Sequence, residues 1–176
     1  AGRLANAELG DLSDIFARVG VNADAAGMSF DKTLAFIETI SNIERNPERL
    51  GTLVDDILRA FNNISYQKRI QKISGVNFFN TDGSRRDAFA VFNDIKKKYD
   101  TFKTEQQQSL FVGSMLKGAD QGTIKGFRTL LSGTMLDTGE EFTKKIAEAG
   151  STIKHDLNGA LNNAVDQAGR LRNILG

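Results

Sequence analysis

Apolar residues recur along this chain at the three- and four-residue steps of helices, not at the alternating positions of strands. The first pattern predicts a short helix over residues 8–19, and residues 20–28 read as a loop. Ser29 is a good N-cap for a second helix. The inward stripe of that helix comprises Phe30, Leu34, Ile37, Ile40 and Ile43.

A third helix begins at Asn46-Pro47, because Asn caps helix starts and Pro is tolerated at the first helical position. Its apolar face continues to Phe61, and the pattern weakens at residues 62–63. A basic helix, a phenylalanine-rich helix and two shorter helices follow. Their expected boundaries are Gly75 at the end of the basic helix, Ser84 before the phenylalanine-rich helix, Thr104 with Gln107 as a capping box, and Asp120.

Ser132 and Gly133 close this series of helices, and a long helical pattern resumes near Thr138. The pattern therefore predicts an all-α fold, a compact multi-helix bundle followed by a long C-terminal helix. Sheet is expected nowhere except as a short extended piece near residues 76–79. We divide the chain into a body, residues 1–135, and an extended amphipathic helix, residues 136–176.

The C-terminal region repeats its apolar or small residues every eleven positions. Eleven residues over three turns is about 3.67 per turn, so the stripe stays on one side of a nearly straight helix. The stripe is thin and rich in Ala, so something must cover it. We expect the helix to self-associate, and docking on the body is the alternative. The repeating rows are Phe142, Ile153, Ala164 and Leu175; Ile146, Leu157 and Ala168; and Ala149, Ala160 and Leu171.

Composition supports a folded helical chain. Of the 176 residues, 40% are hydrophobic, twelve are Phe, and only one is Pro, which favours long helices over strand-and-turn architectures. Cysteine is absent, so disulfides and cysteine-ligated metals are excluded. No apolar run reaches 18 residues, and the N-terminus lacks the plan of a signal peptide.

Charge is unevenly distributed although the net charge is only +1. Residues 67–103 carry nine bases and four acids, whereas residues 11–63 carry nine acids and five bases. Such runs indicate either solvated helix faces or a surface that binds a partner. The run at residues 96–98, with Tyr99, is the one candidate for nucleic-acid contact, and no recognised binding motif accompanies it.

The corner at residues 80–83, Asn-Thr-Asp-Gly, is the strongest candidate for ion chemistry. An EF-hand alignment with Gly83 at position 6 puts Phe78 and Phe89 at positions 1 and 12, where charged ligands are required. A phosphate loop is excluded because no GxxxxGK[ST] motif occurs. We therefore predict a structural turn with a positive φ at Gly83, and core burial of Phe78 or Phe79.

No other residues form a catalytic set. His155 is the only histidine and is expected to be solvated. The Gly122–Gly126 spacing indicates close helix packing or a poor helix rather than a dimerisation motif. We therefore predict no catalytic, cofactor-binding or metal-binding residues, no cofactor, no small-molecule substrate and no enzymatic activity.

From residue 8 to residue 133, the order of these segments resembles the helical region of phage tail tape-measure proteins. The resemblance includes a corner matched by Gly75, Val76, Asp82 and Gly83, and a Leu-Leu-Ser-Gly end matched by residues 130–133. Glycine-rich segments usual before the corner are missing, and residues 46–61 are more charged than the family pattern. The family has no catalytic residues in this region, so none is carried over.

The resemblance implies a structural role: setting tail length, templating tail-tube polymerisation, and leaving the tail ahead of DNA. Tail-tube and tail-tip proteins would be the partners, and direct DNA binding is not expected. The chain would lie in the tail lumen of the virion, and in the bacterial host cytoplasm during assembly. Because tape-measure proteins are much longer than 176 residues, the chain would be a fragment. The alternatives are an unrelated helical scaffold or adaptor, and a helical module that binds nucleic acid through its basic patch.

Overall fold

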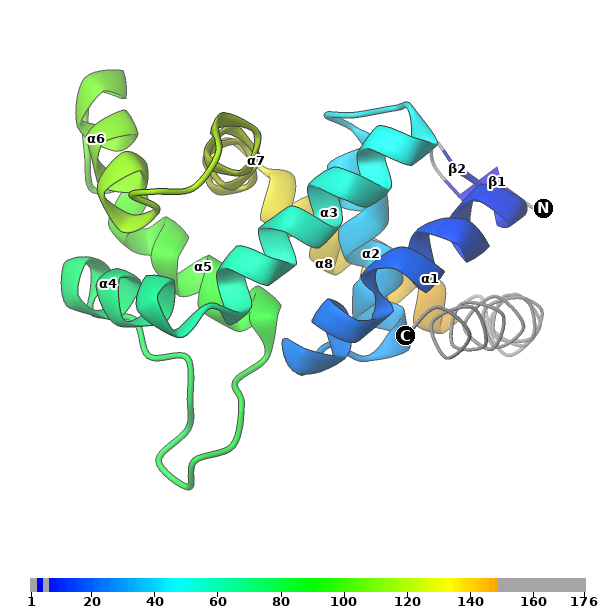
Figure 1. Cartoon of the computed structure of the whole chain (residues 1–176), viewed down its shortest axis with the longest axis horizontal. Helices are drawn as coiled ribbons and strands as arrows, with labels where there is room; N and C mark the ends of the chain where they lie inside the picture. The colour runs from blue at the N-terminus through cyan, green and yellow to red at the C-terminus, as the bar shows by residue number, and fades with distance from the viewer. Residues whose placement is uncertain (1–2, 5–6, 149–176) are drawn as a thin grey trace, which may run out of the picture.

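The computed structural model describes residues 3–4 and 7–148 and shows the all-α bundle that the sequence predicts (Figure 1). The described chain begins with two short antiparallel strands, β1 (Arg3–Leu4) and β2 (Ala7–Glu8), which the apolar pattern did not predict. The helices that follow are α1 (Leu9–Ala25), α2 (Phe30–Ser41), α3 (Pro47–Asn62), α4 (Ile64–Ser74), α5 (Ala88–Tyr99), α6 (Glu105–Met115), α7 (Gln121–Leu131) and α8 (Met135–Glu148).

Capping residues set most of these boundaries as predicted. Ser29 accepts a hydrogen bond from the Lys32 N–H at 3.3 Å, and Asn46 accepts one from the Arg49 N–H at 3.0 Å. Asn63 ends α3 and caps α4, which explains the weak pattern there. The remaining confirmed boundaries are Gly75 at the end of α4, Thr104 with Gln107 before α6, and Asp120 before α7.

The predicted loop at residues 20–28 is wrong, because α1 continues to Ala25. Ala23 is buried on the same side as Val19, so the apolar face extends by one more turn. The last turn is also held to α3 at two points. The Asn22 side chain donates to Asp55 Oδ1 at 2.7 Å, and the Asn22 carbonyl accepts from Asn62 Nδ2 at 2.8 Å.

Helix α2 is central rather than amphipathic, because all its residues from Thr33 to Ser41 are buried. It packs against α3 on one side and α8 on another. Its Phe36 ring begins an aromatic cluster that crosses the molecule. Phe92 of α5 lies 6.0 Å from Phe36, 5.0 Å from Phe61 of α3 and 5.4 Å from Phe127 of α7, measured between ring centroids.

The start of the C-terminal helix also differs from the prediction. α8 begins at Met135, three residues before Thr138, and it packs against α2, α5 and α7. Leu136 is fully buried, so the first turn of α8 is part of the core. The remainder of the predicted helix lies outside the described residues, as does His155, and the division at residues 135 and 136 stays a prediction.

Candidate functional site

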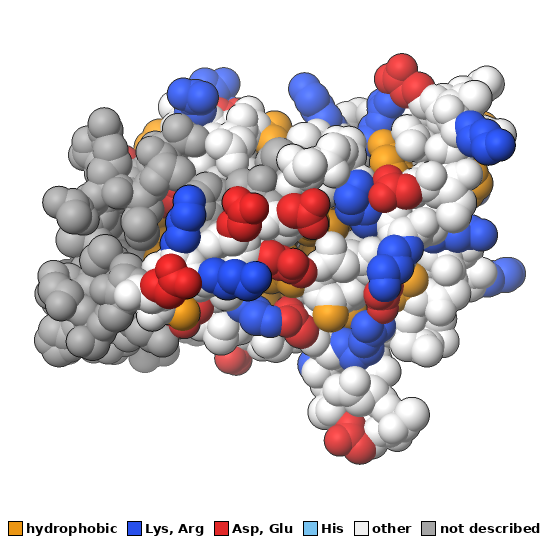
Figure 2. All heavy atoms as spheres, turned by 180° about the vertical axis from the view of Figure 1, so that it is seen from behind, with side chains coloured by type: hydrophobic (Ala, Val, Ile, Leu, Met, Phe, Trp, Pro, Cys, Tyr) orange, Lys and Arg blue, Asp and Glu red, His pale blue; other side chains and the backbone are white. Residues whose placement is uncertain are grey.

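The predicted corner forms the tip of an arm, residues 76–86, that projects from the helices between α4 and α5 (Figures 1 and 2). Its two sides pair as a minimal antiparallel ladder with a bridge between Phe79 and Arg85. The Asn80 N–H donates to the Ser84 carbonyl at 2.8 Å, and the Arg86 N–H donates to the Phe78 carbonyl at 3.0 Å. The extended piece expected near residues 76–79 is therefore half of this arm.

The tip is a turn closed by its own side chains. Gly83 has φ of 88°, which confirms the predicted left-handed conformation. Asp82 Oδ1 accepts from the Ser84 N–H at 2.9 Å and from the Ser84 hydroxyl at 2.6 Å. These two hydrogen bonds lower the pKa of Asp82 from its usual value. Ser84 is thus a turn residue, and the prediction that it caps α5 is wrong: Asp87 caps α5, accepting from the Phe89 N–H at 2.9 Å.

Phe78 and Phe79 point to opposite sides of the arm, as predicted for neighbours in an extended segment. Phe78 is 3% exposed and lies 4.9 Å from the Phe61 ring, whereas Phe79 is 44% exposed. The arm is therefore anchored in the core on one side and presents an aromatic ring to solvent on the other.

Arg85 fastens the exposed side of the arm to α3. Its guanidinium lies over the rings of Phe61 and Phe79, at 5.7 and 5.3 Å from their centroids, and donates to Asn62 Oδ1 at 2.8 Å. Burial lowers the pKa of Arg85 from its usual value. The sequence pattern did not identify Arg85 as a functional candidate.

Arg86 fastens the opposite side of the arm to α5. Its guanidinium donates to the Asn77 carbonyl at 2.8 Å and to Asp94 Oδ2 at 2.6 Å. The hydrogen bond from Arg86 lowers the pKa of Asp94. Neighbouring side chains of an extended segment point to opposite sides. This alternation could have predicted from the sequence that Arg85 and Arg86 contact different helices.

The residues that carried the resemblance hold structural positions. Gly75 has φ of 77° and donates its N–H to the Gln71 carbonyl at 2.8 Å, which ends α4 in a left-handed cap. Val76 is buried at the base of the arm. Leu130 and Leu131 are fully buried in the last turn of α7. The motif therefore encodes the entry to the arm and the end of a core helix.

The lysine run at residues 96–98 does not form one continuous face. Lys96 donates to the Leu131 carbonyl at 3.0 Å and pairs with Asp100 at 3.2 Å, while Lys97 lies 3.6 Å from Asp94. Lys98 lies 6.0 Å from the centroid of the Phe102 ring. The run is thus divided among separate local partners, which weakens the nucleic-acid hypothesis for these residues.

α7 packs closely against α3 at Gly126, one of the two glycines of the Gly122–Gly126 spacing. A Cβ built on Gly126 would lie 2.7 Å from Ile57 Cδ1 and 3.2 Å from Leu53 Cδ1. The glycine thus lets α7 approach α3 more closely than any side chain would permit.

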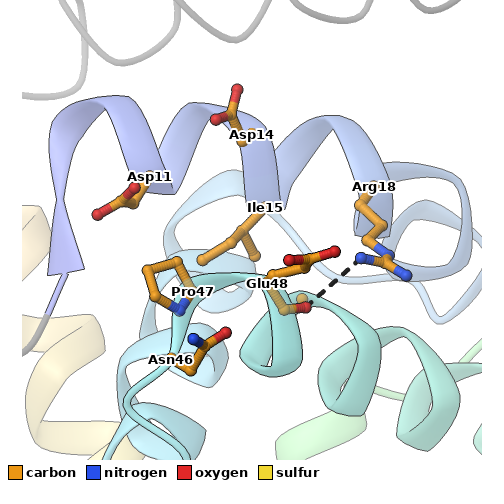
Figure 3. A pocket seen from close by; sticks show the side chains of 8 residues that line it. Asp11, Asp14, Ile15, Arg18, Asn46, Pro47 and Glu48 are labelled. Atoms are coloured by element: carbon orange, nitrogen blue, oxygen red, sulfur yellow. Dashed lines mark hydrogen bonds between the residues drawn. The ribbon is translucent and has the colours of Figure 1, made fainter.

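A hollow of about 420 Å³ lies between α1 and the start of α3 (Figure 3). Asp11 and Asp14 line its α1 side, and Ile15 points toward Pro47. Arg18 donates to the Glu48 carbonyl at 3.4 Å across the gap. In the part of the chain that the structure describes, no group of three or more His, Cys, Asp or Glu side chains is placed to hold a metal ion. Within residues 3–4 and 7–148, no helix has the length and apolar character to span a membrane.

These features define a helical protein whose distinctive elements are an ordered arm and charged helix faces. The sequence profile described as "Phage-related minor tail protein" matches residues 1–116, about two thirds of the chain, so the chain belongs to that family. No curated protein sequence and no solved structure matches the chain. Membership of this family supports a structural role in the phage tail, association with the virion and contact with other tail proteins.

Proposed function

We propose that this chain is a non-enzymatic segment of a tail tape-measure protein, which helps to set tail length and templates assembly of the tail tube. The observation that carries the proposal is the eleven-residue apolar repeat from Phe142 to Leu175, joined to a body that belongs to a minor tail protein family. A protein that measures length needs an extended segment of uniform rise. An eleven-residue repeat supplies one, because it keeps a single apolar stripe along a straight helix.

The thin stripe also supports self-association. Gly150, Gly159 and Gly169 each disfavour a lone helix by up to about 1 kcal/mol relative to Ala. Copies of the helix that cover one another's stripes would compensate, and such a bundle would fit inside a tube. We infer that the C-terminal helices pair in the tail lumen and that tail-tube and tail-tip proteins are the contacts of the assembled bundle. Family membership favours this account over a scaffold of unrelated origin.

The lumen assignment is tested on purified virions with an antibody against the body of the chain. The protein should resist added protease in intact tails and should leave the particle when DNA release is triggered. A control antibody against an outer tail protein reports whether the protease is active. Detection of the chain on the outside of intact tails, or its retention in emptied particles, would contradict a tape-measure role and leave the broader tail-protein assignment standing.

A further inference from the structure

The helical part of the described chain, up to residue 148, divides into two halves of opposite charge. Residues 64–132, which include α4 to α7, carry twelve Lys or Arg and six Asp or Glu, a net charge of +6. Residues 9–63 and 133–148, which include α1 to α3 and α8, carry seven basic and thirteen acidic residues, a net charge of −6. In Figure 1, α4 and α6 lie at one end of the long axis and α1 lies toward the other.

Internal ion pairs leave these opposite charges largely in place. Arg86–Asp94 and Arg128–Glu105 join residues of the positive half, at 2.6 and 2.7 Å. Arg59–Asp55, at 2.5 Å, joins residues of the negative half. Lys32–Asp87 joins the two halves, but it pairs a base of the negative half with an acid of the positive half and so leaves the excess charge of each half unpaired. A pair within one half cannot change the net charge of that half. The excess charge therefore remains at the surface, where Figure 2 shows Lys and Arg gathered toward the α4–α6 end.

Helix α4 presents an exposed stripe on the positive half. Ile64, Lys68 and Lys72 are spaced four residues apart and are exposed, whereas Gln67 and Ile70 are buried against the body. Ile64 is a large apolar side chain and is 67% exposed. We call Ile64, Lys68 and Lys72 the α4 stripe.

Helix α1 presents a complementary stripe on the negative half. Asp14, Val21 and Asp24 are exposed, and Val21 is 66% exposed, while Ile15 and Val19 are buried. Arg18 lies on the same side of α1, but its guanidinium turns toward α3 and donates to the Glu48 carbonyl at 3.4 Å. We call Asp14, Val21 and Asp24 the α1 stripe.

The two stripes match in spacing. Seven residues separate Asp14 from Val21 and eight separate Ile64 from Lys72, which on a helix is about 10 to 12 Å in each case. When Val21 lies against Ile64, a carboxylate of the α1 stripe comes within reach of a lysine of the α4 stripe. Opposite charge and matched apolar positions together favour contact between an α1 stripe and an α4 stripe over contact between two like stripes.

We propose that the α4 stripe of one molecule docks on the α1 stripe of a second copy. The two stripes are different surfaces of one chain, so each copy can use both at once, and the contact extends head to tail. Two single helix faces form a small interface, so the contact is weak and depends on salt. It involves neither the C-terminal helix nor the length-setting role.

The test is sedimentation velocity of the full chain at several concentrations, in about 20 mM and about 500 mM salt. Two variants reverse the stripes: Lys68→Glu with Lys72→Glu, and Asp14→Lys with Asp24→Lys. The part of wild-type association that depends on the two stripes should appear at low salt and be lost at high salt, and association through the C-terminal apolar stripe should remain at high salt. Each reversed variant alone should associate at least about tenfold more weakly, and an equimolar mixture of the two should recover the wild-type association. The matched control, Lys68→Arg with Lys72→Arg, should behave as wild type.

Three results would overturn the proposal. The first is a wild-type chain that stays monomeric at low salt. The second is association that persists in both reversed variants but is lost in the Leu157→Asp, Leu161→Asp variant. That result would assign self-association to the C-terminal helix alone. The third is a monomeric chain that binds a short DNA duplex and loses that binding in the Lys68→Glu, Lys72→Glu variant, which would assign the α4 stripe to nucleic acid.

Discussion

Gly126→Ala tests the close approach of α7 to α3 that organises the core. The added Cβ would lie 2.7 Å from Ile57 Cδ1, nearer than real Cβ contacts come, and 3.2 Å from Leu53 Cδ1. Ile57 is fully buried, so its side chain has little room to move. Overpacking of a well-packed core costs about 1 to 3 kcal/mol, and the helix propensity of Ala over Gly returns up to about 1 kcal/mol. We expect the free energy of unfolding to fall by about 1 kcal/mol.

The matched control is Gly113→Ala in α6, where a built Cβ has no other heavy atom within 4 Å. That variant gains the same helix propensity without a clash, so its free energy of unfolding should rise by up to about 1 kcal/mol. Urea unfolding followed by circular dichroism measures both variants. Ile57→Val removes the Cδ1 atom that clashes. The double variant with Gly126→Ala should therefore be more stable than additivity predicts.

The reasoning would be refuted if Gly126→Ala stabilised the chain as much as Gly113→Ala does. It would also be refuted if the Gly126→Ala and Ile57→Val effects were additive, because the contact between α7 and α3 would then not lie where the structure places it.

Four further predictions concern the arm and two carboxylates. Gly83→Ala should lower the free energy of unfolding by about 1 kcal/mol, because a residue with a Cβ is forced into a left-handed conformation, and Gly83→Asn should lower it less. Equal stability of wild type and the two variants would contradict the left-handed turn. Calcium or magnesium should not change the melting temperature, and a metal-dependent increase that disappears in Asp82→Ala would refute a purely structural corner. Arg86 lowers the pKa of Asp94. The ionised Asp94 therefore stabilises the fold above the ordinary aspartate pKa, and this stabilisation is lost as the pH falls through the folded-state pKa. Asp94→Asn should unfold at a lower urea concentration than wild type at neutral pH and match wild type in strong acid. Burial, and secondly the Asp120 carboxylate, raise the pKa of Asp56. The ionised Asp56 therefore lowers the free energy of unfolding above its folded-state pKa, and this destabilisation disappears as the pH falls through that pKa. Asp56→Asn should be more stable than wild type at neutral pH and lose this advantage in acid.

Local signals in the sequence predicted most of the helical framework. Ser29, Asn46 and Asp120 act within three residues of their own positions, and Gly75 and Gly83 are required by the backbone conformation at those positions. The errors occurred where distant contacts decide the outcome. Residues 20–25 are helical because α3 holds them, which short-range apolar spacing cannot reveal.

The arm shows the same division between local and distant causes. The turn at its tip follows from residues 80–84 alone, and the burial of Phe78 follows from the alternation of an extended strand. The clamps of Arg85 and Arg86 depend on Asn62 and Asp94, which belong to other helices. The N-cap of α5 is Asp87 rather than the predicted Ser84, because Arg85 and Arg86 remain extended to reach those partners.

Tail length measured by electron microscopy tests the central claim most directly. Insertion of three further eleven-residue repeats into the segment from Phe142 to Leu175 keeps the apolar stripe in register, and at about 1.5 Å per residue it should lengthen tails by about 50 Å. Deletion of one or two repeats should shorten tails in the same proportion. Tails of unchanged length around the altered protein would contradict a length-setting role.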